Sequence, residues 1–147
     1  MAGQWEATVL IDRPIEEVFG FLADGENDPK FSPRVLEITK KTDGPPGVGT
    51  IYASKVKDAG LKTDRALELT EFEPPTRIRW AERSKNLVTS PEGGYDLAPE
   101  GSRTQLTMHN VLEGHGLGKL LAPLALRSTR KGAGDFGKAI KAAVEAS

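Results

Sequence analysis

Short strand-like runs separated by turn clusters constrain the fold of this chain more than any other feature. The runs in which apolar and polar residues alternate are 4–11, 34–41, 50–57, 62–73, 77–83, 94–97 and 104–112. Clusters rich in Gly, Pro and Asp separate them, as at 43–47 and 58–60. Such short connections join neighbouring strands that run in opposite directions, so the sequence predicts one antiparallel sheet of about seven strands.

Two stretches have helical spacing instead. Pro14 followed by Glu16 and Glu17 suits a helix start, and a helix is predicted over 14–23, with one more short helical turn in 26–31. After Gly116, a long amphipathic helix is predicted whose apolar face carries Leu117, Leu120, Leu121, Leu124, Phe136, Ile140 and Val144. Pro123 either kinks this helix or marks its start.

This order of elements predicts an α+β fold in a single domain, residues 1–147. A single antiparallel sheet of this size needs one face covered. Only the one or two short helices after the first strand and the long terminal helix can cover it. We therefore expect a strongly curved sheet that grips the long C-terminal helix.

Composition and charge exclude several classes of function. The chain has no cysteine, which excludes disulfides and thiolate metal sites. Its 20 basic and 21 acidic residues give a net charge of -1, which offers no electrostatic footprint for nucleic acid. We see no signal-peptide pattern and no apolar run near the roughly 20 residues of a membrane span. The expectation is a cytoplasmic protein without stable membrane insertion, either a monomer or a weak dimer.

An ordered set of motifs resembles the polyketide cyclase/dehydrase group of the START-like (Bet v 1-like, SRPBCC) superfamily. The motifs are Arg-Pro-Ile-Glu-Glu-Val-Phe at 13–19 with Phe-Leu-Ala-Asp at 21–24, Gly-Val-Gly-Thr at 47–50, Glu-Phe-Glu-Pro-Pro at 71–75 with Ile78 and Trp80, and Gly-Ser-Arg-Thr at 101–104. The resemblance covers nearly the whole chain. One departure is Phe31, at a position where the short second helix commonly ends near a tryptophan.

The resemblance implies a helix-grip fold with a deep cavity between the sheet and the C-terminal helix. Members of the group bind lipids, polyketides, hormones or quinones, and some are aromatase/cyclases. They share no set of catalytic residues, so none is transferred. The leading hypothesis is binding of a hydrophobic small molecule such as a lipid, a polyketide or an isoprenoid-like compound. The alternatives are a polyketide cyclase/dehydratase-type enzyme and a protein-interaction or regulatory module.

Strand parity predicts which side chains face the cavity. The predicted ligand-binding residues on the strands are Tyr52, Ser54, Leu67, Leu69, Ile78, Trp80, Glu82, Tyr95, Leu97, Leu106, Met108 and Asn110. Leu120, Leu121 and Leu124 are expected to close the cavity from the helix. The plainer interpretation of the same pattern is that these residues simply fill the core.

Three inward polar residues add detail. A buried Glu82 must be paired or protonated, which makes it a weak candidate for a general acid; alternatively its strand end turns to solvent, where it pairs with Lys or Arg. Asn110 either hydrogen-bonds a ligand carbonyl or satisfies backbone at a bulge. Tyr95 suits a cavity wall because it has an apolar ring and a hydroxyl.

The two histidines offer no metal site. His109 is expected to face outward, and His115 lies in the loop before the long helix. Neither has a partner at metal-ligand spacing. The chain also lacks a P-loop and a Gly-x-Ser-x-Gly nucleophile motif. We expect no metal and no cofactor.

Overall fold

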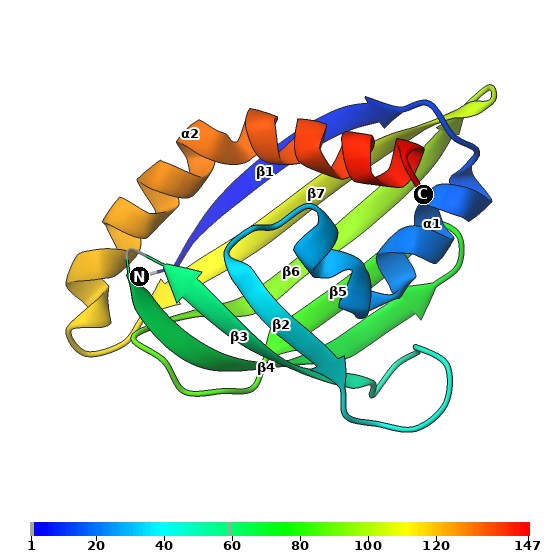
Figure 1. The fold of residues 1–147 in the computed structure, drawn as a ribbon. Helices are drawn as coiled ribbons and strands as arrows, with labels where there is room; N and C mark the ends of the chain where they lie inside the picture. Colours follow the sequence, from blue (N-terminus) through cyan, green and yellow to red (C-terminus); the bar gives the residue numbers. More distant parts are fainter. Residues whose placement is uncertain (1, 59) are drawn as a thin grey trace.

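The computed structural model describes residues 2–58 and 60–147, in which a long helix lies across the concave face of one sheet (Figure 1). The strands are β1 (Ala2–Ile11), β2 (Val35–Lys40), β3 (Ile51–Asp58), β4 (Leu61–Glu73), β5 (Arg77–Glu82), β6 (Val88–Glu100) and β7 (Arg103–Gly114). The helices are α1 (Ile15–Ala23), the 3-10 helix η1 (Gly25–Lys30) and α2 (Gly118–Glu145).

All seven strands belong to one antiparallel sheet in the order β1-β7-β6-β5-β4-β3-β2. The first strand therefore forms one edge beside the last, and the short connections of the middle strands build the rest. Helix α2 packs mainly on β1 and β7, while η1 packs on β2 at the opposite edge (Figure 1). The predicted α+β helix-grip fold is confirmed.

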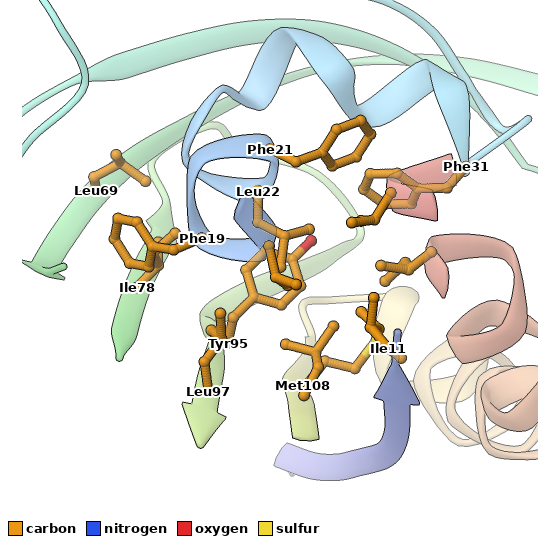
Figure 2. Packing of buried hydrophobic residues seen from close by; sticks show 14 of the residues in the cluster. Ile11, Phe19, Phe21, Leu22, Phe31, Leu69, Ile78, Tyr95, Leu97 and Met108 are labelled. Carbon is orange, nitrogen blue, oxygen red and sulfur yellow. The ribbon is translucent and has the colours of Figure 1, made fainter. Parts of the chain in front are cut away.

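Alternation along the strands sends one set of side chains to the inner face. Cross-strand partners there include Tyr95 with Met108 and Leu97 with Leu106. These residues pack with Ile11 and with α1 into the hydrophobic core (Figure 2). The neighbouring residues on each strand face outward and are mostly charged or polar, which explains why the period of two was readable in the sequence.

One predicted strand boundary is wrong. The Pro-Glu-Gly-Gly sequence at 91–94 was expected to separate two strands, yet β6 runs through it from Val88. A register shift between Thr89 and Glu92 marks a bulge, and a bulge is one of the few places where a sheet accepts proline. Gly93 is needed just after it, because a side chain there would overlap the indole of Trp80 and come within 2.7 Å of the Asn110 side-chain oxygen.

The predicted apolar face of α2 is also wrong in its first half. Leu117, Leu120, Leu121 and Leu124 are 45–74% exposed. Gly118 and Ala122 face the interior instead, and the buried row continues through Ala133, Gly137, Ile140 and Val144. Small residues occupy these positions because they let the helix approach the strands closely. The helix runs unbroken through Pro123, and Figure 1 shows that it bends along its length.

Candidate functional site

The inner face of the sheet is fully packed at one end, which we call the closed end. Its defining residues, Ile11, Tyr95, Leu97, Leu106 and Met108, are at most 8% exposed. Helix α1 and the second half of α2 cover them (Figure 1). Figure 2 shows the ring of Tyr95 surrounded by apolar side chains from these elements. The closed end is therefore hydrophobic core.

A row of aromatic rings crosses from the sheet edge to α1 through α2 and the end of η1. Trp5 on β1 meets Phe136 of α2 with ring centroids 5.9 Å apart. Phe136 meets Phe31 at 5.7 Å, and Phe31 meets Phe21 at 6.3 Å. Such contacts at tilted or edge-on angles are favourable beyond the area they bury. Phe31, the residue that departs from the family pattern, therefore still fills an aromatic position.

Beyond this row, the inner face of the middle strands is incompletely covered. We call this part the open end and define it by Leu67, Trp80, Glu82 and Asn110. Trp80 lies on β5, the central strand of the sheet, yet it remains partly exposed, as do Leu67 and Asn110. The reason is that, among the described residues, α2 packs mainly on β1 and β7 and does not pack on β4 or β5. Trp80 also packs edge-on against Tyr95, with centroids 5.1 Å apart.

Glu82 is buried and paired rather than turned to solvent. Its side chain is 3% exposed, and Arg65 lies 3.1 Å away across the sheet. The Ser84 hydroxyl, the Asn86 amide and the Ser90 backbone N–H also donate to its carboxylate, at 2.6, 3.1 and 2.9 Å. A carboxylate that accepts from this many donors is held in a fixed position. This arrangement favours a structural role over proton transfer for Glu82.

Arg65 extends the same cluster to the neighbouring backbone. Its guanidinium donates to the Val88 carbonyl at 2.6 Å as well as to both oxygens of Glu82. At the bulge of β6, the Ser90 hydroxyl hydrogen-bonds the Asn110 side-chain oxygen. Asn110 therefore bonds a side chain at the bulge, which leaves its amide nitrogen as the donor that could serve a ligand.

Asp28, on η1, is a polar residue that the sequence pattern did not single out. Desolvation, and then the nearby charge of Asp24, raise the pKa of its carboxyl from 3.8 to about 7. Burial, with a smaller effect of the Asp28 charge, raises the pKa of the Tyr95 hydroxyl well above its usual range. The Tyr52 pKa is raised as well, chiefly by burial. The charge of Asp28 thus acts on both inward tyrosines.

Tyr52 has a structural task that explains its burial. Its hydroxyl donates to the Ala23 carbonyl at 3.4 Å and accepts from the Gly25 N–H at 3.3 Å. It thereby fixes the junction between α1 and η1 above β3. Ser54, its neighbour on the inner face, is also buried.

Both histidines lie at the positions expected from the sequence. His109 is on the outer face of β7, 4.0 Å from Glu92. His115 is in the loop before α2, 2.7 Å from the Thr89 hydroxyl and 3.7 Å from Glu113. Within the described residues, no group of three or more His, Asp or Glu side chains is placed to hold a metal ion. Over the same residues, no helix is long and apolar enough to cross a membrane.

The predicted ligand-binding residues thus fall into three groups. Leu69, Ile78, Tyr95, Leu97, Leu106 and Met108 are core at or beside the closed end, and Tyr52 and Ser54 are buried on β3. Leu67, Trp80, Glu82 and Asn110 form the open end. The third group, Leu120, Leu121 and Leu124, points away from the sheet, so the expectation that these leucines close the cavity is wrong.

Two surface hollows lie outside the residues that define the open end. One of about 250 Å³ lies in the loop between β2 and β3, from Thr42 to Thr50. Another, of about 230 Å³, lies over β2, β3 and β4 and is lined largely by outward residues such as Glu37, Lys41 and Asp64. Charged linings of this kind do not suit an apolar ligand.

Comparison with known proteins gives a family and a fold. The model of the family described as "Polyketide cyclase / dehydrase and lipid transport" matches residues 3–145. No curated protein matches the chain. Among solved structures, the protein TTHA0849 from Thermus thermophilus has a TM-score of 0.80 at 21% identity, covering 98% of both chains.

Two further solved structures share this fold. The Zhui aromatase/cyclase from Streptomyces sp. R1128 has a TM-score of 0.82 at 17% identity, covering 99% of this chain and 94% of that one. A START superfamily protein from Mycobacterium smegmatis has a TM-score of 0.77 at 17% identity, covering 97% of each chain. At sequence identities this low, the similarity shows a shared fold and does not show a shared function.

Proposed function

The chain belongs to the polyketide cyclase/dehydrase and lipid transport family, and from that premise we propose that it binds an apolar small molecule at the open end, between the middle strands and α2. The observation that carries this proposal is the partial exposure of Trp80 on the central strand of the sheet. An inward aromatic side chain at such a position is normally sealed by the covering layer. Here it offers an apolar wall to a ligand.

The polar groups around Trp80 support the same site. Ligand pockets combine apolar walls with a few fixed polar groups that orient the ligand. The amide of Asn110 is held through its oxygen by Ser90, and Leu67 provides further apolar surface. Glu82 and Arg65 neutralise each other, so they add rigidity without adding a net charge that an apolar ligand would have to desolvate.

A second candidate function, a cyclase- or dehydratase-type reaction, is favoured by Asp28. A carboxyl whose pKa is about 7 can both accept and donate a proton near neutral pH. The charge of Asp28 acts on the inward tyrosines, while Glu82 is fully paired, so Asp28 replaces Glu82 as the candidate for proton transfer. This reaction would require the ligand to reach past Trp80 toward η1.

Thermal-shift and calorimetric titration with fatty acids, isoprenoid quinones and aromatic polyketides tests the binding proposal. At least one class should raise the melting temperature, because a ligand that binds only the folded state stabilises it. Trp80→Ala should weaken binding by about tenfold or more, as expected for loss of a central aromatic contact. Trp5→Phe is the matched control, since Trp5 is an inward indole inside the aromatic row.

Two results would contradict the proposal. A ligand that binds Trp80→Ala as tightly as the wild type lies somewhere other than the open end. A panel in which nothing shifts the melting temperature, with a wild-type protein that is folded by circular dichroism, would leave the inner face as core alone and favour a protein partner.

A further inference from the structure

The first half of α2 presents an apolar surface that no other described part of the chain covers. We call it the leucine face and define it by Leu117, Leu120, Leu121 and Leu124, which are 73%, 74%, 45% and 62% exposed. Leu87 and Leu61 are also exposed, at 51% and 69%. Single exposed leucines are ordinary, but a group of them within about two turns of helix forms a patch that indicates a partner.

These leucines gather at one end of the molecule. Leu87 lies against the start of α2, since its carbonyl accepts from the His115 N–H at 2.8 Å and a side chain at Gly118 would overlap it. The neighbouring Asn86 donates to the Asp64 carbonyl near the start of β4, the strand that Leu61 opens. Figure 1 shows the start of α2, the end of β3 and the start of β4 at the same end of the sheet.

The helix segment that carries the leucine face is basic. From 114 to 134 the chain contains four basic residues, Lys119, Arg127, Arg130 and Lys131, and no acidic residue. Arg130 donates to the Gln4 carbonyl rather than to a carboxylate. Because the whole chain has a net charge of -1, this segment is a local positive region on a slightly negative protein.

From this combination we propose that the leucine face docks on a lipid bilayer with anionic headgroups. The leucines enter the headgroup layer, and the basic side chains of α2 bind the lipid phosphates, as amphipathic cationic helices do when they lie in a membrane interface. Docking is peripheral. It places the open end of the inner face next to the bilayer, but it rests on surface residues alone and does not depend on the proposed ligand site.

Charge argues against a second copy of the chain as the occupant. A symmetric dimer through the leucine face would bring the same surface of both copies together. The basic side chains of Lys119, Arg127 and Lys131 would then lie near the same basic set of the other copy, and like charges in an interface oppose association. An anionic bilayer offers the complementary charge and an apolar layer at once.

Vesicle co-sedimentation tests the docking. Two preparations are compared, pure phosphatidylcholine and phosphatidylcholine with about 30% phosphatidylserine, which supplies the negative surface potential. The protein should sediment with the anionic vesicles and less with the neutral ones, and added salt should weaken the difference. The double variant Leu120→Ser/Leu124→Ser and the double variant Arg127→Glu/Lys131→Glu should each reduce binding by about tenfold or more.

Matched control variants distinguish binding through the leucine face from non-specific binding to vesicles. Val48→Ser removes a side chain that is 70% exposed in the β2–β3 loop, at the other end of the sheet, and Lys138→Glu reverses a charge on the second half of α2. Both should bind as the wild type does. Melting temperatures of all variants show that they are folded.

Three outcomes would overturn the proposal. One is the absence of sedimentation with anionic vesicles. Another is equal loss of binding in the control variants. The third is a concentration-dependent dimer in size-exclusion chromatography that Leu120→Ser/Leu124→Ser abolishes, because the leucine face would then be covered by a second copy.

Discussion

The closed and open ends lie on the inner face of one sheet, yet they differ in how the helices cover them. At the closed end, α1 and the second half of α2 seal Leu106 and Met108 to 0% and 1% exposure. At the open end, α2 passes over β1 and β7 and leaves Trp80 and Leu67 partly exposed. The position of the covering helices, rather than the strands themselves, therefore determines which inner-face residues belong to the hydrophobic core and which belong to the candidate ligand site.

The polar residues follow the same division. The open end carries the Arg65–Glu82 pair and its donors, while the closed end is almost entirely apolar. A buried ion pair is a poor way to add stability, because desolvation offsets most of the attraction. Its presence at the open end is easier to explain by the rigidity it gives to the strands beside Trp80.

The largest expected effect comes from breaking that pair. Arg65→Ala leaves the Glu82 carboxylate buried without its cation and should lower the free energy of unfolding by about 3 to 5 kcal/mol. Urea denaturation measures this loss. The control is Arg34→Ala, which breaks the exposed Arg34–Asp58 pair and should cost less than about 1 kcal/mol. Similar losses of unfolding free energy in both variants would mean that the Arg65–Glu82 pair is as exposed to solvent as a surface ion pair.

A somewhat smaller effect is expected from the closed end. Leu106 is 0% exposed, so Leu106→Ala should cost about 3 kcal/mol through lost burial and a new cavity. Leu124 is 62% exposed, so Leu124→Ala should change stability by less than about 0.5 kcal/mol. The same urea series measures both. A loss above about 2 kcal/mol in Leu124→Ala, the size expected of a core truncation, would show that the leucine face packs against the interior.

The smallest expected effect is the pH dependence of stability that Asp28 on η1 adds to the fold. Its pKa is 3.8 in an unfolded chain and about 7 in the fold, so the folded state holds the proton more tightly. The stability it contributes is complete below pH 3.8 and is lost as pH rises toward about 7. Asp28→Asn cannot ionise, so it should be more stable than the wild type above pH 7. The full shift corresponds to about 4 kcal/mol, and because Asp28 is partly exposed, solvent screening reduces this to about 2 kcal/mol.

Melting curves from about pH 4 to about pH 8, a window set by the two Asp28 values, measure this difference. The control Glu16→Gln removes a charge from an exposed position of α1 and should leave the slope unchanged. A wild-type slope that matches that of Asp28→Asn across the whole range would mean that the carboxyl is fully solvated.

Most of the strands could be predicted from the sequence, because the alternation of apolar and polar residues is a local pattern. Each β-strand shows its buried face through a period of two, and the turn residues between strands mark their ends. The exception was β6, where Pro91 and Gly93 indicated a break. Their role becomes clear only with the neighbouring strands in place, since Gly93 makes room for Trp80 and Asn110.

The candidate site was less predictable because it depends on contacts between distant segments. Leucine spacing on α2 indicates an apolar face, but which face meets the sheet was decided by Gly118 and Ala122, whose small size carries little periodic signal. The partner of Glu82 depends on the β4–β5 register, which shifts between Leu69 and Glu71. Asp28 lies in a short polar segment with no pattern of its own.

Native mass spectrometry of the protein purified from its own host, with extraction of any bound molecule, tests the ligand site most directly. We predict an apolar molecule bound in a one-to-one complex with the wild type and lost from Trp80→Ala, whose fold is checked by circular dichroism. An apo mass for the wild type, or the same bound molecule retained at full occupancy by Trp80→Ala, would contradict a ligand site at the open end.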